Sequence, residues 1–285
     1  MHDIDRTGIL FLKTPVSNSV PLVLDSPHSG TTYPDDFDHV SDFTVLRRAE
    51  DTYVHELYDC APRYGAVLMG AHFPRSYIDV NRSLEEIDLS MIDGNWEGPV
   101  VSSEKADAGI GLIWRVNQNN ENLYDRKLSI EEVRHRILTY WQAYHETLKN
   151  SLEETHTRFG KYVHINCHSM PEISNESSKE GPGVRRAEFV LGDRHGTTCD
   201  PELTRTTKNI LEDLGYEVKV NDPYAGVELV KAYSNPANNR HSLQVEIRRD
   251  LYMEEESLGK NSNFEKLQND LETLVAGLSD FSTSL

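Results

Sequence analysis

The sequence predicts an α/β sandwich built on a mostly parallel sheet. Two observations carry this prediction. Short runs of β-branched and aliphatic residues end in polar loops, and amphipathic helical patterns lie between these runs. Such alternation is typical of a sheet whose parallel strands are joined by helices. Because there is no internal repeat and no long linker, we expect a single domain over residues 1–285.

The predicted strands are apolar runs bounded by Gly, Pro, Asn and Asp. On the last run Leu243, Val245 and Ile247 alternate onto one face, so that Glu246 lies on the opposite face. The runs comprise residues 20–24, 66–69, 77–82, 162–167, 188–192, 217–220 and 243–248.

Apolar residues at three- and four-residue spacing predict the helices that separate the strands. Ser129 and Glu132 have the spacing of a capping box at the start of the second helix. The segments 83–111 and 174–183 are polar, and we expect them to be loops that border a site. The predicted helices cover residues 46–61, 130–148, 203–214 and 264–278.

The composition limits the possible partners. The chain has 29 Lys and Arg residues against 47 Asp and Glu residues, which gives a formal net charge of −18. A surface of this charge repels DNA, RNA and anionic membranes, so we expect neither nucleic acid nor a membrane as a partner. An anionic small molecule would need a local basic pocket.

The cysteines and the start of the sequence indicate the compartment. The three cysteines, Cys60, Cys167 and Cys199, have no CxxC spacing, which argues against a disulfide framework and suits a reducing compartment. The first residues, MHDIDRTG, lack the basic region of a signal peptide, and no apolar run is long enough to span a membrane. We expect a cytoplasmic protein, either a monomer or a small homo-oligomer.

Polar residues lie at the ends or on the faces of three predicted strands. His28 follows the first strand, His168 directly follows the run 162–167, and Glu246 lies on the last strand. Ligands of open α/β sheets gather at the carboxyl ends of the strands. Two histidines with nearby carboxylates are the parts of a catalytic zinc site that keeps one position open for water.

The carboxylate ligand is expected from Glu50 or Asp51. If a helix runs through residue 50, Glu50 lies on its apolar face near Leu46 and Tyr53, whereas Asp51 lies toward the flank. A carboxylate in an apolar stripe is costly unless it is paired or binds a metal, which favours Glu50. The choice depends on where the helix begins and stays open at this point.

Six segments resemble the successive motifs of the N-formylglutamate amidohydrolases. They are DSPHSGTTYP, RRAEDTYVHELY, RSYIDVNR, NCHSMP, FVLGDRHGTTCDPEL and HSLQVEIRRDLYMEE, in that order along most of the chain. The resemblance implies a three-layer α/β/α sandwich with a mostly parallel mixed sheet, of the zinc-carboxypeptidase and phosphorylase/hydrolase-like type. It also implies a metal-dependent hydrolase of linear amides.

The same resemblance implies a role for several residues. His28, Asp51 and His168 would hold a divalent metal, first of all Zn²⁺, and Glu246 would be the general base. The recurrent acid of the family motif falls at Asp51, which favours Asp51 over Glu50. The implied reaction cleaves N-formylglutamate, or a similar N-acyl acidic amino acid, in histidine catabolism; N-formylglutamate would give formate and glutamate.

The carboxylates of such a small-molecule substrate need cationic partners. Arg82 in YIDVNR is the first candidate, together with its neighbour Asn81, and Arg115 and Lys231 follow. The family often has GGYITRHYG where this chain has GVELVKAYS, so that Lys231 stands in place of an Arg. A point charge there replaces a planar donor that binds a carboxylate through two hydrogen bonds.

Two other functions remain open from the sequence. One is a zinc amidase that acts on a larger, peptide-like substrate, which the expected cytoplasmic location disfavours. The other is a catalytically silent protein that binds an acidic metabolite, which the presence of Glu246 disfavours, because a binding module needs no base. Each histidine also has a structural alternative, since a histidine at a strand end is often only hydrogen-bonded.

Overall fold

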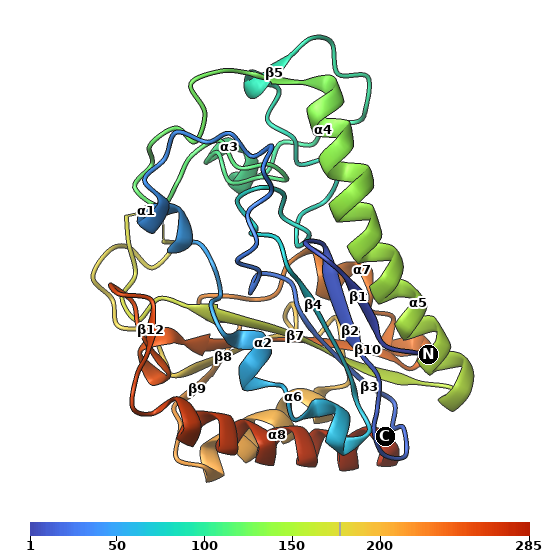
Figure 1. The fold of residues 1–285 in the computed structure, drawn as a ribbon. Helices are drawn as coiled ribbons and strands as arrows, with labels where there is room; N and C mark the ends of the chain where they lie inside the picture. Colours follow the sequence, from blue (N-terminus) through green and yellow to red (C-terminus); the bar gives the residue numbers. More distant parts are fainter. Residues whose placement is uncertain (177) are drawn as a thin grey trace.

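The centre of the computed structural model is a mixed eight-stranded sheet in the order β1-β2-β4-β3-β7-β10-β8-β9 (Figure 1). The structure describes residues 1–176 and 178–285, so the predicted loop 174–183 includes one position outside the described residues. Strands β4, β3, β7 and β10 run parallel, and β2 and β8 pair with them in the antiparallel sense on either side. The strands are β1 (Ile4–Arg6), β2 (Leu10–Lys13), β3 (Leu22–Ser26), β4 (Val67–Ala71), β7 (Tyr162–Met170), β8 (Phe189–Gly192), β9 (Val218–Val220) and β10 (Arg240–Arg248).

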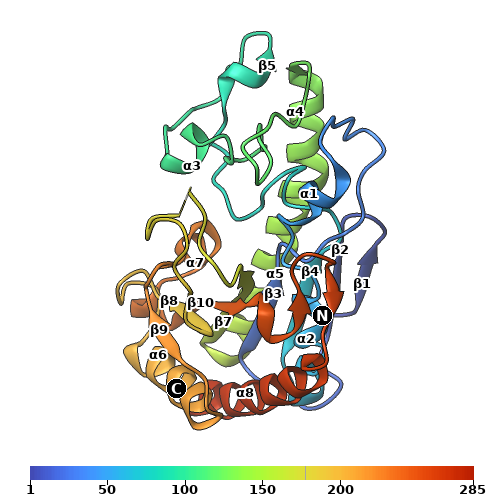
Figure 2. The same ribbon diagram turned by 90° about the vertical axis from the view of Figure 1, so that its left-hand side faces the viewer.

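Helices cover both faces of this sheet, as the two views of the ribbon show (Figures 1 and 2). Helices α2 (Val54–Leu57), α6 (Pro201–Asp213) and α8 (Phe264–Ser284) pack on one face. Helices α5 (Gln142–Phe159) and α7 (Glu228–Ala232) pack on the other. The predicted three-layer α/β/α sandwich is therefore confirmed. None of the described helices is both long and apolar enough to cross a membrane.

The segment between β3 and α2 and the segment between β4 and α5 form a cap above the sheet (Figure 1). The cap carries few regular elements, in agreement with the polar composition of segment 83–111. Its elements are α1 (Phe43–Arg47), β5 (Ile92–Asp93), α3 (Glu104–Asp107), β6 (Leu128–Ser129) and α4 (Ile130–Arg136), and a small hairpin of β11 (Met253–Glu254) and β12 (Gly259–Lys260) follows β10.

The two faces of the sheet differ in chemistry. Leu243, Val245 and Ile247 of β10 lie in the apolar core beneath α6 and α8, as the alternation predicts. Gln244 and Glu246 share the opposite face, where the Gln244 amide donates a hydrogen bond to Glu246 Oε1 over 2.8 Å. Because strand residues alternate, the parallel strands collect their polar side chains on the single face toward α5 and α7.

The expected strand over residues 77–82 is wrong, whereas the other six expected strands are present. The backbone turns here because the Asp79 carboxylate accepts the N–H of Asn81 over 2.9 Å, and the Asp79 carbonyl accepts the N–H of Arg82. Side-chain bonds of this kind compete with a strand ladder. Strands β1 and β2 at the edge of the sheet were not expected.

The expected continuous helix over residues 46–61 is also wrong. Helix α1 ends at Arg47, and α2 begins only at Val54. Between them the Asp51 N–H donates to the His28 carbonyl over 2.9 Å, and Tyr53 takes a left-handed conformation with φ of 67°. This conformation is incompatible with a continuing helix, so the turn at Asp51 separates two short helices.

The other three helices are confirmed, and the second is longer than expected. The capping box of Ser129 and Glu132 starts α4, a π-helical turn over Ile137–Trp141 follows, and α5 continues to Phe159. Helices α6 and α8 occupy the ranges expected for the third and fourth helices, with α8 extended to Ser284.

His145 of α5 fastens this helix to the turn that contains Asp79. Its Nε2–H donates to the Val80 carbonyl over 2.8 Å, and its Nδ1 accepts the Tyr233 hydroxyl over 2.8 Å. The ring also stacks on Trp141 with 3.7 Å between centroids. Burial lowers the pKa of His145 to about 4. A neutral ring therefore satisfies both nitrogen atoms in the folded protein.

We expect the stability of the protein to depend on pH through His145. The pKa of the ring is about 4 in the folded protein against 6.5 for a free histidine, so the unfolded chain binds the proton first as the pH falls. The contribution of the neutral ring is complete above about pH 6.5 and is lost toward pH 4, by about 3 kcal/mol in total. Urea unfolding at successive pH values should show a steeper loss in the wild type than in His145→Gln; equal slopes would contradict this prediction.

Candidate metal centre

Three predicted ligands meet at the carboxyl edge of the sheet. His28 follows β3, Asp51 lies in the turn between α1 and α2, and His168 lies near the end of β7. All three side chains are buried, and their ligand atoms lie within 4.8 Å of one another. Asp51 Oδ2 is 3.0 Å from His168 Nδ1 and 3.5 Å from His28 Nδ1. The structure thus brings together residues that are far apart in the sequence.

Hydrogen bonds on the far side of each imidazole ring assign its tautomer. His28 Nε2 lies 2.7 Å from a carboxylate oxygen of Asp79, and His168 Nε2 lies 2.7 Å from the amide oxygen of Asn166. The Asp79 oxygen is an acceptor, so His28 Nε2 carries the proton. At His168 Nε2 the oxygen of Asn166 is closer than the amide nitrogen of Asn81, at 2.7 against 3.2 Å, which favours the same tautomer, so each Nδ1 presents a lone pair. The Nδ1 atom of His28 is buried and has no hydrogen-bond partner among the described residues.

Two lone pairs and a carboxylate therefore face one another in a buried space. Such an arrangement is repulsive unless a cation lies between the donors. Histidine nitrogen and carboxylate oxygen are common zinc ligands, and ligating histidines usually donate their other N–H to a carboxylate or carbonyl group. The residues present consequently fit a divalent metal held by His28, Asp51 and His168.

A buried network behind the centre fixes the orientation of Asn166. The Asp25 carboxylate accepts hydrogen bonds from Asn166 Nδ2, His164 Nε2 and the Tyr144 hydroxyl, over 2.8, 2.8 and 2.7 Å. Burial alone would raise the pKa of Asp25, but the charge and hydrogen bonds of these neighbours hold it below its usual value. Because the Asn166 amide nitrogen is bound to Asp25, its oxygen atom faces His168.

Asp51 is held as a carboxylate. Its Oδ1 accepts Nη2 of Arg249 over 3.1 Å, which leaves Oδ2 directed at the two histidines. The arginine therefore fixes one oxygen and leaves the other available as a ligand.

Glu246 lies beside the three ligands, because β10 pairs in parallel register with β7 and places Glu246 next to His168. Burial, with a smaller contribution from the Asp51 charge, raises the pKa of Glu246 to about 7. His168 and Arg75 act in the opposite direction. A carboxylate with a pKa in this range suits the exchange of protons near neutral pH.

Glu50 points away from this centre. Its carboxylate accepts the Tyr33 hydroxyl over 2.6 Å and the Thr52 hydroxyl over 3.2 Å, and it pairs with Arg47 over 3.3 Å. Burial raises the pKa of Glu50. The helical-wheel argument for Glu50 assumed a helix through residue 50, and the turn at this point removes that assumption.

The predicted cations have different surroundings. Arg82 is buried close to Asp79, and its guanidinium donates to the carbonyls of Asn81 and Ile110. Arg115 and Lys231 instead form ion pairs with the carboxylates of Asp88 and Glu228, over 2.7 and 3.7 Å. Of the three cations, the structure brings Arg82 toward the metal centre.

Asn81 is buried behind His168 rather than facing open space. Its Oδ1 accepts the N–H of Leu229 over 2.9 Å, and its Nδ2 lies 3.2 Å from His168 Nε2. Asn81 therefore connects the turn at Asp79 to the start of α7.

Sequence reasoning missed the groups that orient the ligands. Asp79 and Arg75 form an ion pair of 2.9 Å, and Asp79 also binds His28. Arg249 anchors Asp51 from the segment that follows β10. Asp79 lies in the same motif as Arg82, so the sequence offered a signal for the pair of Asp79 and Arg75. The orientation of Arg249 had no signal in the sequence, because it depends on how the chain leaves β10.

The sheet of this α/β/α sandwich carries two histidines and a glutamate at its carboxyl edge, and the turn beside it adds an aspartate. This combination defines a metal-dependent hydrolase. The sequence model of the N-formylglutamate amidohydrolase family matches residues 20–253. The chain belongs to this family, which confirms the predicted resemblance.

Individual relatives agree with this assignment. An N-formylglutamate deformylase of Pseudomonas putida is 29% identical over 244 residues, covering 83% of both chains, and one of Pseudomonas aeruginosa is 27% identical over 247 residues, covering 84% of both. The crystal structure of an N-formylglutamate amidohydrolase from Ralstonia eutropha JMP134 is 42% identical, with a TM-score of 0.93. That match covers 97% of this chain and 99% of the other.

We expect Asp79→Asn to weaken the binding of a divalent metal, tested with Zn²⁺, on the order of 10- to 100-fold, because the carboxylate that orients His28 is lost. An asparagine amide can also donate to Nε2 and so favour the wrong tautomer. Competition with a chromophoric chelator measures the dissociation constant. Asp88→Asn is the control, since among the described residues the Asp88 carboxylate binds Arg115 and Ser90 and no metal ligand. Equal affinities of the two variants would contradict the role of Asp79.

Proposed function

We propose that the protein is a zinc-dependent amidohydrolase that cleaves N-formylglutamate, or a similar N-acyl acidic amino acid, to the carboxylic acid and the free amino acid. One observation carries the proposal above all. Two imidazole lone pairs and the Asp51 carboxylate converge next to Glu246, whose pKa is raised to about 7. Hydrolysis of an amide by this route needs a set of metal ligands with a base beside it. A protein that only binds a metabolite needs neither.

In the proposed mechanism His28, Asp51 and His168 would hold the metal. A zinc ion held by them would supply Lewis-acid chemistry, which lowers the pKa of a water molecule and polarises the scissile amide carbonyl. Glu246 accepts the proton of the attacking water while the water oxygen bonds to the acyl carbon. Glu246 then delivers this proton to the amide nitrogen as the carbon–nitrogen bond breaks. For N-formylglutamate the products are formate and glutamate.

Arg82 is the proposed partner of a substrate carboxylate. Its Nη2 makes no hydrogen bond within the described part of the chain. The family membership supports an acidic substrate, and the overall charge of −18 makes a local cation necessary for one. We further propose that the chain works as one domain in the cytoplasm, on a small molecule and with no nucleic-acid or membrane partner.

The function is tested with a panel of N-formyl and N-acetyl derivatives of Glu, Gln and Asp. We expect formate release from N-formylglutamate by the zinc-loaded protein, loss of this activity after chelation, and recovery when zinc is returned. Chelation removes the metal ion that the three buried ligand side chains would hold. Absence of turnover for every member of the panel, or full activity after complete metal removal, would rule out the proposed hydrolase.

We expect Glu246→Gln to abolish turnover, with a loss on the order of 10²- to 10⁴-fold in kcat, because the amide cannot accept the proton of water. Bound zinc should remain stoichiometric, since Glu246 is outside the ligand group. Metal analysis together with steady-state kinetics measures both quantities. Asp88→Asn, which removes a carboxylate that pairs with Arg115, serves as the control of folding. Near-normal rates in Glu246→Gln would exclude the role of Glu246.

A further inference from the structure

Three cationic side chains gather on the cap side of the metal centre: Arg75, Arg82 and Lys105. Arg75 lies close enough to Asp51 and Glu246 for their charges to raise its pKa, and it is paired with Asp79. The pKa of Lys105 is lowered by its burial and then by the positive charges of Arg82 and Arg75. The three cations therefore form one cluster that extends outward from the proposed base.

Two members of the cluster lack a close counter-ion. In the part of the chain that the structure describes, no carboxylate lies within ion-pair distance of Arg82 or Lys105, although the charges of Asp79 and Glu86 act on Arg82 and that of Glu104 acts on Lys105. The carboxylates near Arg82 are engaged elsewhere, because Asp79 binds His28 and Arg75, and Glu86 binds the Ser83 N–H and the Ser103 hydroxyl. Burying like charges together without anions is unfavourable unless a ligand supplies the negative charge.

The backbone holds Lys105 next to Arg82. Lys105 lies on α3, its carbonyl accepts the N–H of Ile110 over 2.9 Å, and the Ile110 carbonyl accepts Nε of Arg82 over 3.2 Å. The Lys105 side chain is half-buried. Two consecutive hydrogen bonds thus connect the Lys105 backbone to the Arg82 guanidinium.

The segment that carries Lys105 is tightly seated on the cap. Ser103 caps α3 by accepting the Ala106 N–H over 3.1 Å, and its hydroxyl donates to Glu86. A Cβ atom at Gly111 would lie 2.4 Å from the Glu86 carbonyl oxygen, so only glycine permits this close approach. Lys105 is therefore presented from a fixed backbone rather than from a loosely attached loop.

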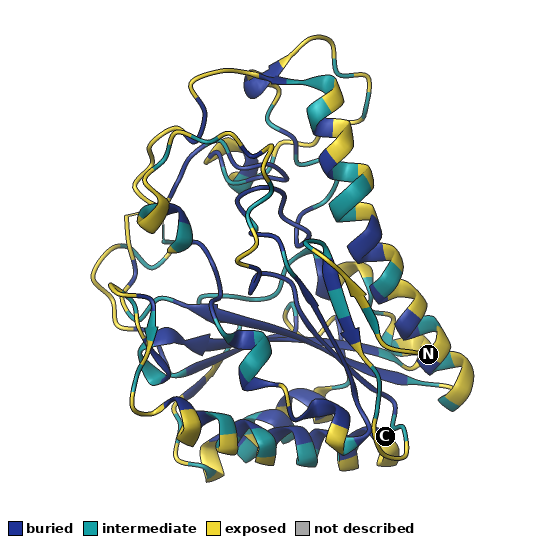
Figure 3. Cartoon of the chain, in the orientation of Figure 1, coloured by how far each residue is buried: buried dark blue, intermediate teal, exposed yellow. Residues whose placement is uncertain are grey.

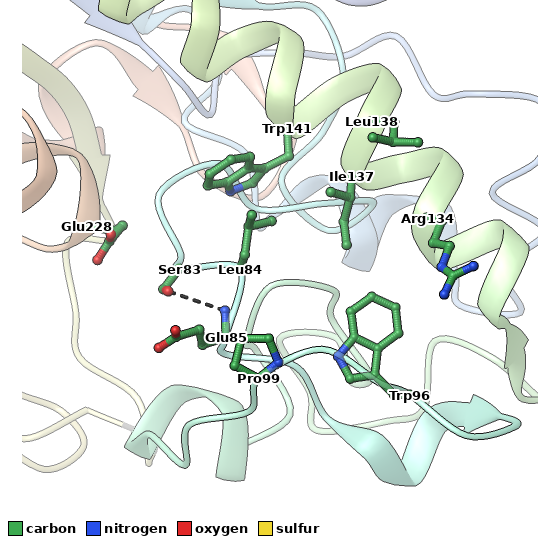
Figure 4. Close-up of a pocket in the computed structure, with 10 residues that line it drawn as sticks. All are labelled: Ser83, Leu84, Glu85, Trp96, Pro99, Arg134, Ile137, Leu138, Trp141 and Glu228. Atoms are coloured by element: carbon green, nitrogen blue, oxygen red, sulfur yellow. Dashed lines mark hydrogen bonds between the residues drawn. The ribbon is translucent and has the colours of Figure 1, made fainter.

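The other neighbouring cations are already engaged. Lys179 pairs with Glu104 over 3.4 Å, and Arg249 binds Asp51. A cavity of about 560 Å³ adjoins the segment that carries Arg82, but Trp96, Trp141 and other apolar side chains line it (Figure 4). Among the described residues, its lining includes no member of the metal centre, so this apolar cavity does not suit a dianion.

We propose that Lys105 is a specificity-determining residue that binds the side-chain carboxylate of the substrate, whereas Arg82 binds the main-chain carboxylate. This inference rests on the proposed function. The main-chain carboxylate is attached to the carbon that bears the scissile amide nitrogen, so it must lie nearer the metal centre. The side-chain carboxylate of glutamate lies two methylene groups further out. Arg82 lies close to Asp79, the partner of His28, whereas Lys105 lies on α3 of the cap and is joined to Arg82 through Ile110. Lys105 is therefore the outer of the two cations.

The test compares three substrates that differ by one charge: N-formylglutamate, N-formylglutamine and N-formylisoglutamine. The last two lack the side-chain and the main-chain carboxylate, respectively. In Lys105→Met we expect kcat/KM for N-formylglutamate to fall on the order of 10- to 100-fold, mainly through KM, because a charge-assisted hydrogen bond is lost. The value for N-formylglutamine should change less than about threefold, since that substrate never made this bond.

The preference for N-formylglutamate over N-formylglutamine should therefore collapse in Lys105→Met, while the preference over N-formylisoglutamine persists. Lys105→Arg should restore most of the first preference, which shows that the charge matters rather than the fold. Lys127→Met removes an exposed lysine and should leave all three values unchanged. Equal losses for all three substrates, or an unchanged glutamate preference, would overturn the assignment of Lys105. Failure of the wild type to hydrolyse any of them would instead overturn the proposed function.

Discussion

The structure depends on the meeting of two imidazole lone pairs and one carboxylate in a buried space. Each of these groups would be stable alone with its outer hydrogen bonds, but together they leave a concentrated negative potential that requires a cation. The hydrogen bonds around these three groups all favour this arrangement. Asp79 and Asn166 fix the tautomers of His28 and His168, and Arg249 holds the far oxygen of Asp51. The surrounding hydrogen bonds thus hold the three groups in the arrangement that a divalent metal would require.

The sheet supplies this organisation through strand alternation and register. Apolar side chains of the central strands pack toward α6 and α8, so the intervening residues, among them Asp25 and His168, must share the other face. Parallel register between β7 and β10 then sets Glu246 beside His168. A slip of one residue in β10 would turn Glu246 into the apolar core. The position of the base is consequently a property of the core packing as much as of the site.

The parts of this architecture that could be predicted from the sequence are those fixed by local pattern. Alternation on β10 and the histidines at the ends of β3 and β7 were sufficient to indicate the sheet and its ligand-bearing edge. The turn at Asp51 could not be predicted, because it depends on a bond to the His28 carbonyl, which is distant in the sequence. At Asp79 the apolar neighbours indicate a strand, but the local hydrogen bond from the Asn81 N–H to the Asp79 carboxylate turns the backbone instead.

The sign of the electrostatic potential differs between the molecular surface and the site. The acidic surface repels anions at long range, and screening by salt confines that repulsion to about 10 Å. Within the site the local cations dominate, because buried charges are screened much less. Among the described residues, Arg82 and Lys105 form no ion pair although acidic residues are abundant, because Asp79 and Glu86 bind other donors. A site built in this way selects anions by the number and spacing of their charges, since a single carboxylate would leave one buried cation uncompensated.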